Sequence, residues 1–477
     1  MSIHKLVFFA SIFHAALRDR RNSRKVIESY RDQSLRVLLR RARQNVPFQR
    51  SRLTNINLKS IRLEDIPPTT KTAMMASFNE TIADGVVSLD DVLRTDTEPP
   101  RLELPIIHGK YIVCKTSGTS GKPSWLVCGL SDWATVRGVT FARMARNWLT
   151  VRKLVSRRLR PLRVATLAAE HAHSMTWQAS LSTEMWAWPF VRARFFPVID
   201  SVEQIVDGLN EYRPEYLHAY PTAVEMLARY RLDGGKFDFE PELLSVGSEP
   251  LTDIARDTIR RAFPATRLVD HYGMSECLPL STDCCYGRKH INTDFAIMEP
   301  MDALGRPVES GELSDHVLVT NLVNQVQPII RYRVEDSVRV FHEPCACGSV
   351  FPVVEVLSRK GSQIHLRSDR GSWQLVSPPI VVDTMLHAQG VAQFQVIHVR
   401  QNELEVKFIP LKGVDGNDAG ASIRQQFTNV LSRLGCALSV KVSIEQVNGF
   451  QRTEIGGKLL QTVSLVAPPT SDQPALA

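Results

Sequence analysis

The sequence has no long apolar run. Nowhere in its 477 residues do about 18 apolar side chains follow one another, as a membrane-spanning helix would require. The N-terminal segment 1–21 holds the apolar stretch Leu6–Ala10, but His14 interrupts it and no small-x-small cleavage site precedes Arg18–Arg21. We therefore expect an amphipathic N-terminal helix in place of a signal peptide. We also expect a cytoplasmic protein with no integral membrane contact, and with peripheral contact at most.

Cysteine is scarce, and the basic residues are not arranged for nucleic acid. Eight cysteines in so long a chain do not make a disulfide framework, so we expect reduced thiols. The net charge is +8, and six basic residues with no acid lie between Arg152 and Arg163. Such a run is either a solvated helix face or a contact for phosphates, including those of coenzyme A. Because no nucleic-acid fingerprint accompanies it, we expect no nucleic-acid partner.

A P-loop is also missing, although a loop of related composition is present. Residues 116–123 read Thr-Ser-Gly-Thr-Ser-Gly-Lys-Pro and follow the apolar run Tyr111–Cys114, which is typical of a buried strand. Thr116 stands where a P-loop has its first glycine, and Pro123 where Ser or Thr reaches Mg²⁺. Glycines let backbone N–H groups approach an anion, and the hydroxyls and Lys122 add donors and charge. The segment is either a phosphate-binding loop or a flexible surface turn.

The hydrophobic pattern indicates an α/β protein of several units, because the chain exceeds what one core usually supports. Apolar residues at helical spacing predict an amphipathic helix over 27–46. After Gly121, predicted strands alternate with helices, which indicates a largely parallel sheet covered by helices. The strands are expected at 164–168, 216–219, 243–246 and 267–269. Ser201 with Gln204 is the pattern of a capping box and predicts the start of one helix, Pro221 predicts the start of another, and Pro47 is expected to end the helix over 27–46.

Further along the chain the pattern changes twice. Between 318 and 340 the segment is rich in β-branched residues and its apolar residues recur at a shorter spacing, which predicts a β-rich, more antiparallel subdomain. The part after about 358 is typical of a small, mobile α+β domain. We expect an N-terminal helical segment at 1–50, a large domain at 51–358, a C-terminal lid domain at 359–466 and a disordered tail at 467–477.

Three loops follow the predicted parallel strands. They are Tyr220–Thr222, Gly247–Pro250 and His271–Glu276, all rich in glycine, hydroxyl or carboxylate side chains. Ligands of such sheets bind at the carboxyl ends of the strands. We therefore expect these loops to converge on the edge that carries the candidate phosphate loop.

Taken in order, these motifs resemble the adenylate-forming superfamily of acyl-CoA synthetases, peptide-synthetase adenylation domains and luciferases. The sequence looks most like the phenylacetate-coenzyme A ligase-like branch. The likeness runs from LLRRARQNVPFQR at 38–50 through TSGTSGKP, SVGSEPL, DHYGMSE, RYRVEDSVRV and CACG to RTEIGGK at 452–458. It implies that a carboxylate attacks the α-phosphorus of ATP to give an acyl-adenylate, and that a second nucleophile then takes the acyl group. This first step brings two anions together and therefore needs cations and N–H donors.

The resemblance implies a role for each matching residue. Glu276 would coordinate Mg²⁺, Asp336 would accept both ribose hydroxyls, and Lys458 would reach the α-phosphate and the carboxylate during adenylation. Together with Thr119, Glu276 and Lys458 are the candidate catalytic residues. The phosphates would be held by Ser117, Gly118, Thr119, Ser120, Gly121 and Lys122. The remaining nucleotide contacts would come from Gly247, Ser248, Glu249, Pro250, Tyr272, Gly273, Ser275 and Arg359. Taken singly, each carboxylate could be structural and Lys458 a surface lysine.

The sequence departs from the family at the expected hinge. Where the family has G-R-x-D, this chain has Ser358-Arg359-Lys360-Gly361, so the hinge acid is missing and Lys360 or Gly361 must absorb any rotation of the lid. In the family that rotation opens the thiol tunnel. The acceptor therefore stays open between coenzyme A, our first choice, and an amine that would give an amide. Outside catalysis, the alternative is a degenerate nucleotide-binding protein.

Two cysteine pairs form a candidate metal site. Cys345 and Cys347, with Cys284 or Cys285 and with His290, would give a tetrahedral Cys₃His set suited to Zn²⁺, and some members of this branch look to have such a structural zinc. The spacing does not decide which of the two adjacent cysteines would bind, and ordinary buried thiols are the other interpretation.

The acid that is activated is expected to be aromatic or apolar. An acyl pocket is predicted between the aromatic segment Trp177–Phe196 and Tyr216–Thr222, with its apolar walls from Trp177, Trp186, Trp188 and Phe190. His171 and His173 flank the segment, either as partners of a substrate carboxylate or as ordinary core histidines.

Overall fold

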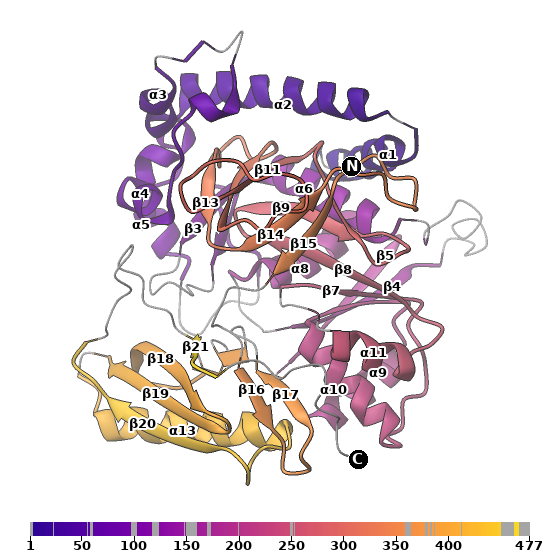
Figure 1. Ribbon diagram of the computed structural model, residues 1–477, viewed down its shortest axis with the longest axis vertical. Coiled ribbons are helices and arrows are strands. Elements are labelled where there is room, and N and C mark those ends of the chain that lie inside the picture. Colours follow the sequence, from indigo (N-terminus) through magenta and orange to yellow (C-terminus); the bar gives the residue numbers. More distant parts are fainter. Residues whose placement is uncertain are drawn as a thin grey trace.

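The structure is a computed structural model (Figure 1). It describes residues 3–21, 23–54, 56–57, 61–96, 103–116, 124–146, 148, 160–168, 173–198, 200–248, 251, 253–357, 364–376, 380–381, 384–385, 387–411, 413–449 and 462–466.

A nine-stranded sheet forms the centre of the fold. Its order is β14-β15-β10-β9-β8-β7-β6-β4-β5. The parallel half contains β5 (Val191–Pro197), β4 (Leu162–Ala168), β6 (Tyr216–Ala219), β7 (Leu243–Val246) and β8 (Arg267–Met274). The predicted parallel strands are therefore confirmed, and the neighbours β9 and β10 extend the sheet in antiparallel fashion.

Successive residues of the parallel strands are buried on opposite faces of the sheet. Leu217 and Val246 pack under α9 (Val202–Tyr212), α10 (Pro221–Leu232) and α11 (Asp253–Ala262). Tyr216 and Leu243 face the opposite layer, which contains α6 (Leu130–Met144) and α8 (Met175–Ala187). Local signals explain where two helices begin: Ser201 caps α9 in the predicted capping box with Gln204, and Pro221 occupies the first position of α10.

One boundary differs from the prediction. The segment 271–274 was expected as a loop, but it continues strand β8 to Met274. The reason is pairing with β9 (Cys277–Asp283), in which His271 lies opposite Thr282 and Met274 opposite Cys277. Only Ser275 and Glu276 remain in the turn, so Tyr272 and Gly273 are held by a strand.

The β-rich part follows in sequence. It consists of β10 (Lys289–Ile291), β11 (Ala296–Met301), β12 (His316–Asn321), β13 (Tyr332–Val334), β14 (Ser337–Phe341) and β15 (Val353–Leu357), all antiparallel in their pairings with one another. The strands β1 (Ile106–Ile107), β2 (Tyr111–Lys115) and β3 (Trp125–Gly129) form a separate three-stranded sheet.

Helices at the N-terminus cover the body (Figure 1). They are α1 (Ile3–Arg21), α2 (Arg24–Asn45), α3 (Pro47–Leu53), α4 (Lys71–Ala76) and α5 (Leu89–Leu93), with short 3₁₀ turns at Leu63–Asp65, Phe78–Thr81 and Ala83–Gly85. The predicted amphipathic helix corresponds to α2, which buries Leu35, Leu38, Leu39 and Ala42. Pro47 ends that helix as expected, and it also begins α3 because proline is favoured at the first helical position.

The C-terminal part has a core of its own. β16 (Ile364–Arg367) pairs with β17 (Trp373–Val376), and β20 (Lys441–Gln446), β19 (Glu403–Pro410), β18 (Val391–Arg400) and β21 (Thr462–Ser464) form a mixed sheet against α13 (Gly416–Arg433). Phe408, Ile423 and Phe427 lie in this core. The predicted hinge at 358–361 and the tail from 467 lie outside the described residues, so these domain boundaries stay predictions. In the described part of the chain, no helix is long and apolar enough to cross a membrane.

Candidate active site and sulfur cluster

Two tyrosine–carboxylate pairs meet beyond the carboxyl end of β8. The Tyr272 hydroxyl donates to Asp336 Oδ2 at 2.8 Å, and the Tyr332 hydroxyl donates to Glu276 Oε1 at 3.0 Å. Asp336 follows β13, some 60 residues after Tyr272, so the fold joins two motifs that are distant in sequence. Both acids and Tyr272 keep part of their surface accessible. The arrangement therefore presents two oriented carboxylates beside an aromatic ring.

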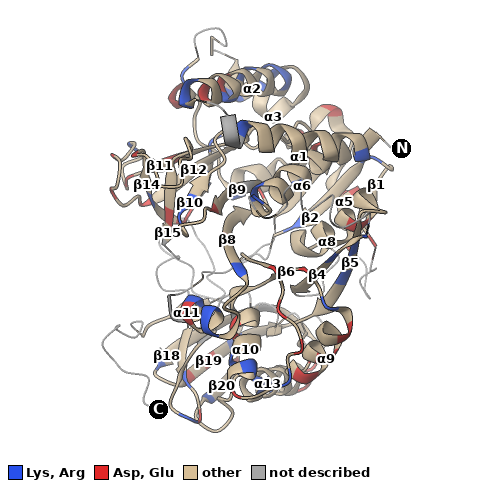
Figure 2. Ribbon diagram, turned by 90° about the vertical axis from the view of Figure 1, so that its right-hand side faces the viewer, with Lys and Arg blue, Asp and Glu red and all other residues tan. Residues whose placement is uncertain are grey.

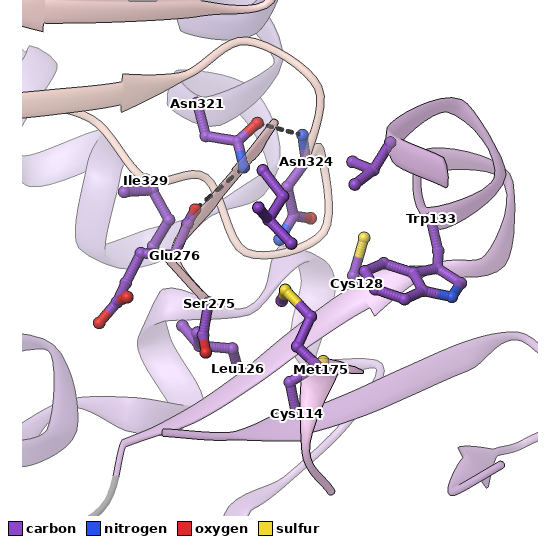
Figure 3. Close-up of a pocket in the computed structure, with 12 residues that line it drawn as sticks. Cys114, Leu126, Cys128, Trp133, Met175, Ser275, Glu276, Asn321, Asn324 and Ile329 are labelled. Atoms are coloured by element: carbon purple, nitrogen blue, oxygen red, sulfur yellow. Dashed lines mark hydrogen bonds between the residues drawn. The ribbon is translucent and has the colours of Figure 1, made fainter. Parts of the chain in front are cut away.

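The turn that carries Glu276 is fixed by a buried amide. Asn321 Nδ2, at the end of β12, donates to the Glu276 carbonyl at 3.0 Å, while Asn321 Oδ1 accepts the N–H groups of Val323 and Asn324 (Figure 3). The sequence analysis assigned no role to Asn321 or Tyr332. Tyr332 stood inside a quoted motif, but nothing in the order of residues indicates that it reaches Glu276.

Glu276 lines a small cavity of about 20 Å³, enough for roughly one water molecule. In Figure 3, Ser275 and Glu276 lie on one side of it, and Cys128 and Trp133 on the other. The full lining is Cys114, Leu126, Cys128, Trp133, Val136, Met175, Ser275, Glu276, Leu278, Asn321, Asn324 and Ile329. Most of these side chains are apolar, so the cavity suits the uncharged part of a small molecule once a flexible group such as Met175 moves.

The predicted aromatic pocket does not coincide with this cavity. Trp177 and Trp186 are buried in the core, where Trp186 lies 6.2 Å from Phe8 between ring centres. Trp188 and Phe190 are each 51% exposed on the outside. None of the four lines the cavity at Glu276. His173 is a core histidine, with Thr95 Oγ1 at 2.9 Å, and His171 lies outside the described residues.

The candidate phosphate loop is the turn of the β2–β3 hairpin. Lys115 pairs with Trp125, and the Thr116 N–H donates to the Ser124 carbonyl at 2.9 Å, so the base of the loop is closed. Ser117–Lys122 themselves lie outside the described residues, as do Glu249, Pro250, Arg359 and Lys458. The flanking strands place Cys114, Leu126 and Cys128 in the same cavity as Glu276. The root of this loop therefore lies beside the carboxylate site.

Two glycines near the site are required by close packing. A Cβ on Gly247 would lie 2.2 Å from the ring of His271, and a Cβ on Gly273 would lie 2.1 Å from a methyl group of Leu278. Ser248 has φ +69°, a left-handed conformation that is uncommon for residues other than glycine. The turn at 247–248 thus packs against the His271 side chain of β8, the residue before Tyr272.

A layer of uncharged polar groups lies beneath this turn. Ser245 Oγ is 2.8 Å from both the Tyr216 hydroxyl and His218 Nδ1, and the rings of His218 and His271 are 5.3 Å apart. Burial, assisted by the nearby Arg137 guanidinium, lowers the pKa of His218 to about 4. Burial also lowers the pKa of His271 well below its usual range. Both imidazoles are therefore neutral at neutral pH.

Four metal-binding side chains gather where strand β10 and the β9–β10 connection meet the β14–β15 connection. The ligand atoms of Cys284, His290, Cys345 and Cys347 all lie within 4.8 Å of one another. Cys284 Sγ is 4.0 Å from Cys345 Sγ, and Cys347 Sγ is 3.3 Å from His290 Nε2. These separations are close to the edges of a tetrahedron around Zn²⁺, roughly 3.5–3.8 Å for the usual bond lengths. Cys285, which the sequence left as an alternative, is exposed and lies outside the cluster.

Neighbouring groups orient these ligands. His290 Nδ1 is 2.7 Å from the Phe351 carbonyl, so it carries the proton, and the unprotonated Nε2 faces Cys347. The backbone N–H groups of Tyr286 and Ser349 each donate to a cysteine sulfur, at 3.4 Å. Such N–H donation favours the thiolate form that a metal requires. The donor set and its surroundings thus fit Zn²⁺.

Known proteins resemble this chain over different extents. A sequence model described as AMP-binding enzyme matches residues 29–313 and ends before Asp336 and the Cys345 pair. Protein CapK of Staphylococcus aureus is 30% identical over 145 residues, 30% of each chain. A phenylacetate-coenzyme A ligase of Thermus thermophilus is 29% identical over 157 residues, 31% of this chain and 34% of its own. The matched stretch thus spans about a third of the length of these curated relatives.

Among solved structures, a 2-hydroxyisobutyryl-CoA ligase in complex with 2-HIB-AMP and CoA superposes with a TM-score of 0.59. The match has 20% sequence identity and covers 94% of this chain and 91% of the other. The likeness therefore extends over nearly the whole fold, the C-terminal part included.

Proposed function

Because this chain belongs to the AMP-binding enzyme family, we propose that it activates a carboxylic acid with ATP and transfers the acyl group to coenzyme A. In the first step a carboxylate oxygen would bond to the α-phosphorus, and the bond from that phosphorus to the leaving pyrophosphate would break. In the second step the thiol sulfur would bond to the acyl carbon and AMP would leave. The observation that carries the proposal is the meeting of Tyr272, Glu276 and Asp336 at one sheet edge.

The described residues support distinct tasks. Asp336 is oriented by the Tyr272 hydroxyl, and a carboxylate has two acceptor oxygens, which suits it to the two hydroxyls of a ribose. Tyr272 and the 247–248 turn, which packs against the neighbouring His271 ring, would together hold the adenine. Ser275, between Tyr272 and Glu276, would contact the α-phosphate. These roles place the reacting phosphorus close to the cavity, which would take the uncharged part of the acid.

Glu276 is the proposed ligand of Mg²⁺. Glu276 lines the cavity, its carboxylate accepts from the Tyr332 hydroxyl and its backbone carbonyl accepts from Asn321, so a hard-oxygen donor is oriented there. When bound, the cation would neutralise phosphate charge in the transition state. The phosphate loop Ser117–Lys122, Arg359 and Lys458 would complete the site, as the resemblance implies. The closed base of the β2–β3 hairpin supports the placement of the loop.

Exchange of labelled pyrophosphate into ATP, driven by a panel of acids, tests the proposal. Exchange that depends on one class of acid is the expected result. No exchange with any acid, in protein that still binds ATP, would favour the degenerate nucleotide-binding protein. Adding coenzyme A should then consume thiol. An amide formed with supplied amines and no thiol consumption would make an amine the acceptor.

We further propose that Cys284, His290, Cys345 and Cys347 hold a structural Zn²⁺. All four ligand positions are filled by protein, which leaves no open position for a substrate. Elemental analysis of the purified protein should find one zinc per chain. Protein that is folded and active with no zinc would reject this assignment.

A further inference from the structure

Helix α1 is apolar on two opposite faces. On one face Phe8, Ser11 and Ala15 are buried against α6, so closely that a Cβ on Gly138 would lie 2.5 Å from the Phe8 carbonyl oxygen. The opposite face carries Ile3, Leu6, Phe13 and Leu17 at helical spacing, with exposed fractions of 66, 51, 61 and 39%. A helix that is apolar all round is normally covered on every side. In the described part of the chain, nothing covers this second face.

Three more apolar side chains continue the exposed face. Met185 in the last turn of α8, and Trp188 and Phe190 in the connection to β5, are each about half exposed. Lys5 of α1 donates to the Trp188 carbonyl, and Phe9 of α1 lies 6.0 Å from Phe190 between ring centres. The α1 face and this turn therefore form one contiguous apolar surface. Such a surface indicates an interaction site, whereas single exposed apolar residues scattered over a protein do not.

The segment that carries this surface is basic. The first 25 residues hold six Lys or Arg and one acid, Asp19. Lys5 lies 5.9 Å from the centre of the Trp188 ring, so a cation stands at the surface itself. Figure 2 shows α1 along the outside of the molecule. The acid closest in sequence to the turn is Glu184.

We propose that the surface formed by α1 and the α8–β5 turn docks on an anionic lipid bilayer. Its Leu, Phe and Trp side chains would enter the headgroup region while the Lys and Arg side chains contact lipid phosphates, the arrangement typical of helices that lie in the membrane interface. A second copy of the chain is the less suitable occupant, because a twofold contact would set the same basic residues against one another. Anionic headgroups supply the opposite charge. This inference does not depend on the proposed enzymatic activity.

Vesicle flotation of the full chain tests the proposal. The protein should float with vesicles of phosphatidylcholine and phosphatidylglycerol at low salt, and much less with phosphatidylcholine alone or at high salt. The double substitution Leu6→Glu/Phe13→Glu should reduce binding by ~10-fold or more, because both side chains would carry charge into the interface. The matched control is Leu304→Glu, 77% exposed in the connection after β11, which should bind like the wild type.

Three results would overturn the proposal. Wild-type protein could stay unbound with anionic vesicles, or the double variant could bind as well as the wild type. Sedimentation could also show a wild-type dimer that is absent in the double variant, which would make a second copy the occupant.

A readout without added charge is quenching of tryptophan emission by brominated phosphatidylglycerol. Quenching should be weaker in Trp188→Phe than in the wild type, and equal quenching would contradict the account.

Discussion

The carboxylate site and the sulfur cluster lie on strands of the same sheet but differ in exposure. Glu276 and Asp336 each accept one tyrosine hydroxyl and remain partly accessible, with Glu276 at a cavity. Cys284, His290 and Cys345 are buried and face one another. Partly accessible carboxylates beside a cavity favour contact with a ligand, whereas a closed set of four donors favours a structural metal. The first region should therefore govern activity, and the second stability.

Glu276→Gln should have the largest effect on activity. The substitution keeps a group that can accept from Tyr332 but removes the charge proposed to bind Mg²⁺, so pyrophosphate exchange should fall by ~100-fold or more. The melting temperature should hardly change, which circular dichroism can measure. Glu335→Gln is the matched control, since Glu335 stands in the same motif and pairs with Arg333 on the surface at 3.1 Å. Equal losses in both variants would remove the special role of Glu276.

Cys345→Ser should show the opposite pattern. Loss of a zinc ligand should release the metal and lower the melting temperature by roughly 5 °C or more, because binding energy of a structural metal is folding energy. Exchange activity per folded molecule at low temperature should remain near the wild-type value. Cys285→Ser, next to the cluster but exposed, should change neither. If the Cys345→Ser protein were stable but inactive, the sulfur cluster would govern activity and not stability, which would contradict the prediction.

The neutral histidines beneath the carboxylate site should make stability depend on pH. In the unfolded chain His218 takes up a proton near its usual pKa of 6.5, but in the folded protein only at a pKa of about 4. The free energy of unfolding therefore falls as the pH falls from the first value to the second. Some contact of the ring with solvent reduces the effect to about 2 kcal/mol. Burial raises the pKa of Asp270 and of Asp132 to about 6, which acts in the opposite sense.

The contribution of His218 must therefore be measured as the difference in unfolding free energy between the wild type and a variant that lacks the imidazole. Free energies of unfolding measured between pH 7 and 4 should fall less steeply for His218→Gln than for the wild type. His14→Gln, exposed on α1, should follow the wild type. Parallel curves for wild type and His218→Gln would show that the imidazole is not held neutral by the fold.

Tyr272→Phe should have the smallest effect. It keeps the ring proposed to stack on adenine and removes only the hydroxyl that orients Asp336, so KM for ATP should rise by roughly 5-fold with little change in kcat. Tyr286→Phe, 64% exposed, serves as its control. A large fall in kcat for Tyr272→Phe would mean that this hydroxyl contacts the reacting groups.

Local signals predicted much of the fold. The capping box at Ser201, the proline that begins α10 and the apolar period of α2 depend on neighbours in sequence, and all three are present. The extension of β8 to Met274 was missed because it depends on pairing with β9. The aromatic pocket was misplaced for a similar reason: composition shows that Trp188 and Phe190 are apolar, but tertiary packing decides that they face outward.

The site was predicted in part. The order of motifs selected Glu276 and Asp336, but their tyrosine and asparagine partners depend on contacts between strands far apart in sequence. Likewise, the sequence does not indicate which of the adjacent residues Cys284 and Cys285 would bind a metal. The fold decides this, because it buries Cys284 and exposes Cys285. The roles of the phosphate loop and of Lys458 stay predictions.

The most direct test of the central claim is a crystal structure of the protein with ATP, Mg²⁺ and an activating acid. The account predicts one nucleotide whose ribose contacts Asp336, whose adenine stacks on Tyr272 and whose phosphates approach Glu276 and the loop 117–122. A nucleotide bound elsewhere, or one that leaves Asp336 and Glu276 without contact, would contradict it.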